Sequence, residues 1–122
     1  MAWPDTPDRS EAFHRVTDIL RCKWTIAVLR SIEQGRHRPS EMQRDNPGLS
    51  SKVLSQRLRK LTDFGLVERR AFAEVPPRVE YRLTPRGRDL TDLVASIAGF
   101  AEHWAGGLSD GGRPPRRSAR TT

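Results

Sequence analysis

The sequence lacks the features that would indicate a disulfide, a structural metal, a membrane-spanning helix or a secretion signal. It holds a single cysteine, Cys22, so it cannot form a disulfide within the chain. Its three histidines, His14, His37 and His103, lie too far apart in sequence to form a local metal-binding motif. No apolar run approaches the roughly 18 to 20 residues of a membrane-spanning helix, and the N-terminus lacks the apolar segment of a secretion signal. We therefore expect a soluble, cytoplasmic domain without a structural metal.

The sequence also lacks the motifs of common enzyme classes. There is no nucleophile and base at a recognisable spacing, no glycine-rich phosphate loop after a strand, and no cluster of metal ligands. We therefore expect no enzymatic activity and no cofactor, which leaves binding as the function.

Positive charge, in contrast, is abundant and unevenly placed. The chain holds 22 Lys and Arg against 15 Asp and Glu, for a formal net charge of +7. Residues 30–88 contain fourteen basic and seven acidic residues, so this middle segment alone matches the whole net charge. Clustered Lys and Arg commonly neutralise the phosphates of nucleic acid. A solvated basic surface is the alternative, and composition does not separate the two.

Length and composition predict one folded domain with loose ends. We expect a flexible N-terminus over residues 1–7, a folded domain over residues 8–106 and a disordered basic tail over residues 107–122. Asp8 or Ser10 is expected to cap the first helix. That helix should turn four apolar side chains inward: Phe13, Val16, Ile19 and Leu20.

The next segments predict two helices separated by breakers. Apolar residues that include Trp24 recur at helical spacing over residues 23–34, and Gly35 provides a stop. After Pro39 there is room for a helix of one or two turns before the Asn-Pro-Gly breaker at residues 46–48.

A longer helix should follow, capped by Ser50 and ended by Gly65. Its apolar face consists of Val53, Leu54, Leu58 and Leu61, whereas Lys52, Gln56 and Arg59 fall on another face. Beyond it the period changes from 3.6 to 2, which predicts strands over residues 66–72 and 79–84. The proline-rich residues 73–78 suit a long hairpin loop, in which we place Arg78.

A final helix is predicted to begin at the cap Thr84, with Pro85 at its first position. Its apolar side is lined by Leu90, Leu93, Val94, Ile97, Ala98, Ala101 and Trp104, and Gly106 and Gly107 end it. The whole order, four helices, a two-stranded ribbon and a last helix, is that of a winged helix-turn-helix, a mainly α member of the α+β class.

In that architecture the second helix of the helix-turn-helix pair enters the major groove, and the ribbon, or wing, lies over the flanking backbone. We therefore predict that DNA is bound by Ser50, Ser51, Lys52, Ser55, Gln56, Arg59 and Arg78. The alternative for any one of them is a polar side chain that serves solubility alone.

Three segments carry a more specific resemblance: KWTIAVLRSIEQG, then LSSKVLSQRLRKLTDFGLVERR, then VPPRVEYRLTPRGRDL. In this order and spacing, from about Val16 to Trp104, the chain resembles the HxlR family of bacterial winged-helix transcriptional regulators. The resemblance implies a cytoplasmic homodimer that binds palindromic operators in double-stranded DNA and pairs through its first and last helices. The sequence supports pairing independently, because a monomer would expose a large apolar patch. We predict a dimer interface of Phe13, Leu93, Ile97, Phe100 and Trp104.

One departure from the family concerns the thiol. Members that sense oxidants carry a cysteine about a dozen residues before the Lys-Trp pair, where this chain has Glu11. Redox sensing by Cys22, which lies between the basic residues Arg21 and Lys23, is one interpretation of this thiol, and packing of a small side chain is the alternative.

Two other functions remain open at this stage. A small-molecule effector could bind between the terminal helices near Trp24, His103 and Trp104, with core packing as the alternative role of these residues. A winged helix can also serve as a protein-interaction module, against which the basic outer face of residues 50–60 argues.

Overall fold

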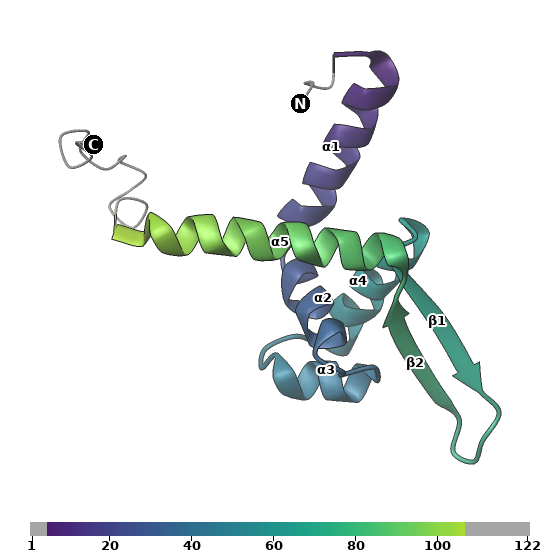
Figure 1. The fold of residues 1–122 in the computed structure, drawn as a ribbon. Coiled ribbons are helices and arrows are strands. Elements are labelled where there is room, and N and C mark those ends of the chain that lie inside the picture. Colours follow the sequence, from purple (N-terminus) through teal and green to yellow (C-terminus); the bar gives the residue numbers. More distant parts are fainter. Residues whose placement is uncertain (1–4, 107–122) are drawn as a thin grey trace. The chain divides into compact units, whose positions relative to one another are not determined.

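The computed structural model describes residues 5–106, so the predicted tail and residues 1–4 of the predicted N-terminus lie outside the described residues. The predicted order of elements is confirmed (Figure 1). The elements are α1 (Pro7–Arg21), α2 (Thr25–Glu33), α3 (Pro39–Asp45), α4 (Ser51–Asp63), β1 (Val67–Phe72), β2 (Arg78–Leu83) and α5 (Pro85–His103). The chain divides into two compact units, one up to Thr91 and one from Asp92 onward, and each is described by itself.

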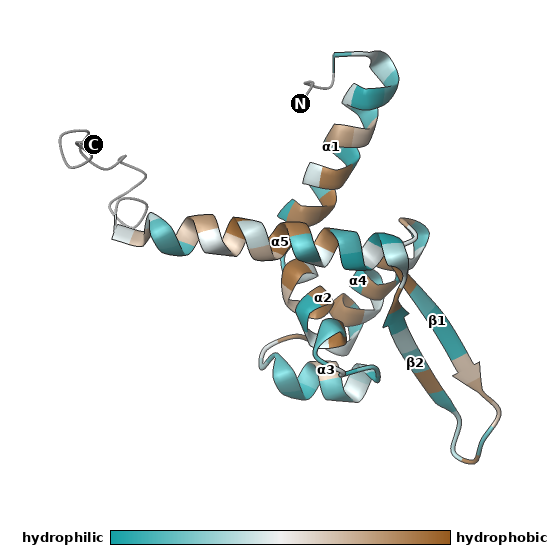
Figure 2. Ribbon diagram, in the orientation of Figure 1, coloured by the Kyte–Doolittle hydropathy of each residue, from teal (hydrophilic) through white to brown (hydrophobic). Residues whose placement is uncertain are grey.

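The core of the first unit forms where α2 packs against α1, α3 and α4. Figure 2 shows hydrophobic residues where α2 and α4 meet. The buried cluster consists of Ile19, Val28, Leu29, Ile32, Met42, Leu49, Leu54, Leu58, Leu61, Leu66, Val67 and Leu90. These residues come from every helix and from β1, so burial of apolar surface holds the helix-turn-helix and the base of the wing together.

The first helix differs from its prediction in its cap and in how much of its apolar face is covered. It begins at Pro7, two residues earlier than a cap at Asp8 would place it, because Pro7 occupies the first helical position and the Thr6 hydroxyl accepts a hydrogen bond from the Arg9 N–H at 3.3 Å. Neither Asp8 nor Ser10 is the cap. Only the C-terminal end of the predicted apolar face is covered: Ile19 is buried, whereas Phe13 and Val16 are 43% and 37% exposed.

The second helix begins later than its apolar spacing suggests. Trp24, predicted as a helical residue, instead precedes α2 with a φ of 75°, in the left-handed region that residues other than glycine seldom adopt. Its ring packs against the core, and the Lys23 ammonium lies 5.6 Å from the ring centroid. Burial of the indole thus accompanies the unusual backbone. The predicted stop is confirmed, since Gly35 ends α2 with a φ of 98°.

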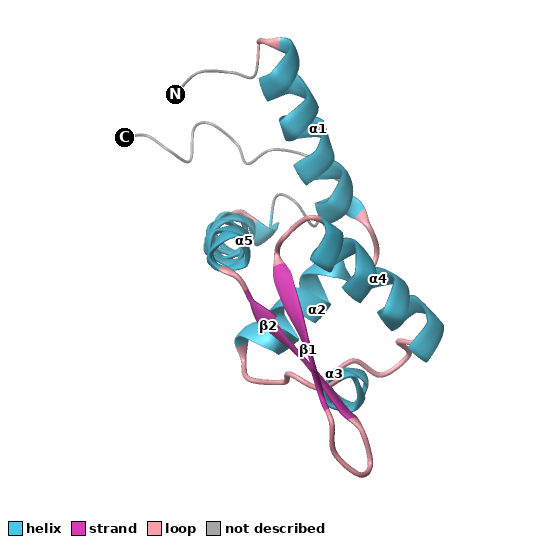
Figure 3. Cartoon of the chain, turned by 90° about the vertical axis from the view of Figure 1, so that its right-hand side faces the viewer, coloured by secondary structure: helices cyan, strands magenta, loops and turns pink. Residues whose placement is uncertain are grey.

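The wing is an antiparallel ribbon in which Val67 pairs with Leu83 and Phe72 with Arg78 (Figure 3). Its base is tied to α5 by the predicted cap, Thr84, whose hydroxyl donates to the Gly65 carbonyl at 2.6 Å and accepts from the Gly87 N–H at 3.1 Å. Gly87 lies against the backbone, because a Cβ placed on it would come within 2.0 Å of the Leu66 carbonyl oxygen. The chain can therefore pass from wing to helix here only if this position has no side chain.

Candidate nucleic-acid interface

Helix α4 presents one apolar and one polar face, as its periodicity predicts. The predicted cap is confirmed, because the Ser50 hydroxyl accepts from the Val53 N–H at 3.1 Å. Leu54, Leu58 and Leu61 are buried in the core. Their burial fixes the rotation of the helix about its axis, so the opposite face must point to solvent.

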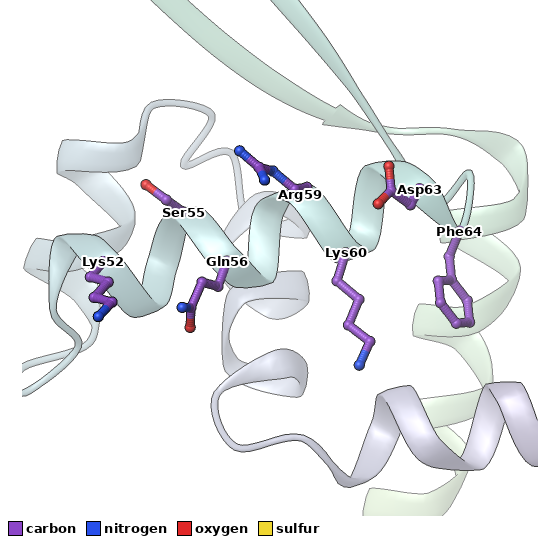
Figure 4. Close-up of a pocket in the computed structure, with 7 residues that line it drawn as sticks. All are labelled: Lys52, Ser55, Gln56, Arg59, Lys60, Asp63 and Phe64. Atoms are coloured by element: carbon purple, nitrogen blue, oxygen red, sulfur yellow. The ribbon is translucent and has the colours of Figure 1, made fainter.

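Figure 4 shows how the side chains of the outer face are arranged. They form two rows with helical i,i+4 spacing, which point to opposite sides of the helix axis in this view. One row holds Lys52, Gln56, Lys60 and Phe64, and the other holds Ser55, Arg59 and Asp63. Together these residues line a surface depression of about 510 Å³. Three cations against one carboxylate make this surface electropositive, and the amide and hydroxyl of Gln56 and Ser55 can both donate and accept hydrogen bonds.

The four predicted central residues, Lys52, Ser55, Gln56 and Arg59, are all exposed. Within residues 5–106, neither Lys52 nor Arg59 forms an ion pair with a carboxylate. Their charges are therefore available to a polyanion without breaking an internal contact.

The two serines at the start of α4 have different surroundings. Ser50 uses its oxygen as the helix cap, which leaves its O–H group as a donor. The Ser51 hydroxyl donates to Gln43 Oε1 on α3 at 3.3 Å, so it links the two helices of the helix-turn-helix. Both serines remain at the exposed N-terminus of α4, where backbone N–H groups favour an anion.

Two other basic residues of α4 position the helix, a role that sequence reasoning missed. Arg57 Nε donates to the Lys23 carbonyl at 2.8 Å, and Lys60 Nζ lies 3.7 Å from the Cys22 sulfur. Both partners lie in the connection between α1 and α2, more than thirty positions away in sequence. No local pattern signals contacts over such a separation.

The surroundings of Cys22 therefore differ from those expected from its neighbours in sequence. Cys22 is the C-terminal cap residue of α1, and its thiol donates to the Asp18 carbonyl at 3.4 Å. The cationic hydrogen-bond partner of the sulfur is Lys60 of α4, and among the described residues no hydrogen bond joins the sulfur to Arg21 or Lys23.

The wing arginine has a different position from the one predicted, and it has partners within the chain. Arg78 is the first residue of β2 and not part of the loop. Its guanidinium lies 3.0 Å from Glu74 Oε2 and 3.4 Å from Glu80 Oε2, and it stacks 4.1 Å from the Phe72 ring centroid. Glu74 and Glu80 were not predicted as partners of Arg78, although their i−4 and i+2 spacing from it was a usable signal.

The second unit carries most of the predicted dimer residues. Leu93, Ile97 and Phe100 of α5 are 49%, 48% and 61% exposed. Three large apolar side chains so close together on one helix are seldom left this exposed to water. The Trp104 ring lies 5.2 Å from the His103 ring and 6.3 Å from the Phe100 ring, centroid to centroid. Leu93, Ile97 and Phe100, together with the partly exposed Trp104, thus give this helix exposed apolar and aromatic side chains.

Two features are absent from residues 5–106. No helix there is long and apolar enough to span a bilayer, and no group of three or more His, Cys, Asp or Glu is placed to hold a metal ion.

A helix-turn-helix with a cationic outer helix and a β-ribbon wing defines a DNA-binding transcriptional regulator of the winged-helix class. The chain belongs to the HxlR-like helix-turn-helix family, whose pattern matches residues 19–108.

Comparison with individual proteins agrees with this assignment. A helix-turn-helix transcriptional regulator of Synechocystis is 39% identical over 89 residues, which cover 73% of this chain and 66% of that relative. The regulator YvaP of Bacillus subtilis is 36% identical, with 75% of this chain and 85% of that protein covered. The solved structure of a MarR-family regulator from Enterococcus faecalis superposes with a TM-score of 0.73 at 33% identity, over 90% of this chain and 99% of that one. The chain thus spans about two thirds of the first relative and nearly all of the solved structure.

Proposed function

We propose that the chain regulates transcription as a homodimer in which α4 of each protomer enters a major groove of an inverted-repeat operator. The observation that carries the proposal is the outer face of α4, where Lys52 and Arg59 are exposed and free of carboxylate partners among the described residues. Arginine, lysine and glutamine are the side chains best suited to base edges, whereas hydroxyls and backbone N–H groups suit phosphates.

Each proposed contact residue takes a role that matches its chemistry. Gln56 and Arg59 read base edges, and the small Ser55 permits close approach of the helix. Lys52 and the two serines at the helix start, Ser50 and Ser51, hold phosphates. Arg78 contributes the wing contact to the flanking backbone.

Dimerisation is the second part of the proposal. Leu93, Ile97 and Phe100 are about half exposed, and a second copy of the chain would remove them from water, together with Trp104 and with Phe13 of α1. A two-fold dimer places two recognition helices about one turn of DNA, or roughly 10 base pairs, apart. The operator should therefore be an inverted repeat.

The proposal assigns the protein a purely binding role in the cytoplasm, where its chromosomal ligand lies. Its relatives are transcriptional regulators, and regulation of this kind requires neither catalysis nor a resident cofactor.

The test is a titration of the purified protein against the duplex upstream of its own gene and against a scrambled duplex of equal length, at two salt concentrations. We expect tighter binding to the first duplex and a symmetric footprint on it. A dimer mass in solution by light scattering should accompany this result. Equal weak binding to both duplexes, together with a monomer mass, would contradict the proposal.

A further inference from the structure

One face of the wing is a network of opposite charges. Side chains alternate along a strand, and the register pairs Glu68 with Arg82, Arg70 with Glu80, and Phe72 with Arg78. These six residues therefore share one face, which we call the charged face of the wing. With Glu74, which reaches the same face through its contact with Arg78, it holds three glutamates and three arginines and has no formal net charge.

Every arginine of the charged face is paired with a carboxylate. Arg70 Nε lies 3.4 Å from Glu68 Oε1, in a pair whose side chains are both more than half exposed. Arg78 bonds Glu74 and Glu80, as described above, and Arg82 lies 3.3 Å from Glu80 Oε1. The Glu80 carboxylate thus uses one oxygen for each of two arginines, and its side chain is only 13% exposed.

Arg78 is the most tightly held of the three. Two carboxylates approach its terminal nitrogens from two sides and the Phe72 ring lies against its plane, so that 27% of its side chain remains exposed. A phosphate would bind the same forked N–H donors that the carboxylates occupy. Phosphate and carboxylate therefore exclude each other at this guanidinium.

We propose that Glu80, together with Glu74, competes with DNA phosphate for Arg78 and thereby limits how much the wing contributes to DNA affinity. The inference rests on the proposed function and adds a regulating pair of carboxylates to it. Ion pairs that are partly exposed to water are weak, so an operator phosphate fixed in place by α4 can displace them, whereas a transient phosphate of unrelated DNA displaces them less often. The carboxylates thus lower non-specific affinity more than specific affinity, which raises the ratio of specific to non-specific affinity.

The test uses Glu80→Gln, which keeps the shape of the side chain and removes its charge. The readouts are dissociation constants on the upstream and scrambled duplexes across several salt concentrations. We expect the variant to bind the scrambled duplex about two- to fivefold more tightly, since the Glu80 carboxylate no longer competes for Arg78. The slope of log affinity against log salt should steepen by about 0.9, the value for one added phosphate contact. The ratio of the affinity for the upstream duplex to the affinity for the scrambled duplex should fall.

A double-mutant cycle separates this mechanism from the general effect of removing a negative charge. In an Arg78→Ala background, Glu80→Gln should lose most of its gain, because the released donor is absent. Glu74→Gln, whose carboxylate contacts only Arg78 among the ion pairs of the described residues and is half exposed, provides a second variant with little risk to folding. A circular-dichroism melt of each variant confirms that it is folded.

The outcomes distinguish the two proposals. Discrimination between duplexes by the wild type, with no gain in the glutamine variants or a gain that persists without Arg78, overturns the inference and leaves the proposed function standing. If the wild-type protein binds neither duplex, both the proposed function and this inference are contradicted.

Discussion

Helix α4 and the wing are two basic surfaces that the sequence presents in the same way and the structure treats differently. On α4, Lys52 and Arg59 extend from an exposed face without carboxylate partners among the described residues. On the charged face of the wing, three arginines are neutralised by three glutamates. The difference teaches that a count of basic residues overestimates the charge available to DNA wherever a strand places an acid two positions from a base, on the same face.

The wing retains one arginine outside this network. Arg69 pairs in register with Tyr81, on the opposite face of the ribbon, and is exposed. Within residues 5–106 it forms no ion pair. The wing therefore separates a neutral face from a face with a single free cation.

The largest effect should come from breaking the junction that holds the wing to the helices. Gly87→Ala would place a methyl group 2.0 Å from the Leu66 carbonyl oxygen, so the backbone must shift. We expect a loss of about 3 kcal/mol or more in the free energy of unfolding, measured by denaturant titration. Gly99→Ala is the matched control, because nothing lies within 4 Å of its added Cβ. It should stabilise the helix by up to about 1 kcal/mol. Equal effects of the two changes would refute the close packing at Gly87.

The second largest effect should come from removing the free charges of α4. Lys52→Ala with Arg59→Ala should weaken operator binding by about 30-fold or more, since each contact contributes about 1 kcal/mol or more. Titration of the upstream duplex measures this loss, and light scattering should show an unchanged dimer. Arg88→Ala, which removes one exposed arginine from α5, serves as the control for the loss of a single surface charge away from α4. Retained affinity in the double variant would exclude α4 as the recognition helix.

A smaller effect should separate the two serines at the start of α4. Ser50→Ala removes the helix cap and should cost about 1 kcal/mol of stability, because the Val53 N–H loses its acceptor. Ser51→Ala removes only an exposed hydrogen bond of 3.3 Å to Gln43 and should leave the melting temperature nearly unchanged. The comparison fails if the two variants melt alike.

The smallest effect should come from the wing. Arg78→Ala should weaken binding to every duplex by about threefold and lower the salt slope by about 0.9, as expected for one phosphate contact. The loss is small because the glutamates already compete for the arginine. A loss confined to the operator sequence would mean that Arg78 reads a base instead.

Local signals in the sequence were sufficient for most of the fold. The caps Ser50 and Thr84 and the stop at Gly35 depend on contacts within a few residues, which is why a single sequence displays them. Helix α1 was less predictable, because its apolar face is covered only near Ile19 and its start depends on Thr6 and Pro7.

The candidate site divides in the same way. The outer face of α4 followed from the periodicity of the three buried leucines, because a helix that buries one face must expose the other. The roles of Arg57 and Lys60 could not be predicted from periodicity, since their partners lie 34 and 38 positions away in sequence.

The sequence by itself determined the order of the elements, the winged-helix class and the side of α4 that faces solvent, because each depends on short-range periodicity and capping. Only the tertiary structure decided which charges are free. The strand conformation places Arg70, Arg78 and Arg82 on the same face as a glutamate two positions away, and the hairpin loop brings Glu74 to Arg78. Packing of α4 on the α1–α2 connection occupies Arg57 and Lys60. The energy of a charge depends on its distance to the next charge and on burial, and neither is contained in sequence spacing.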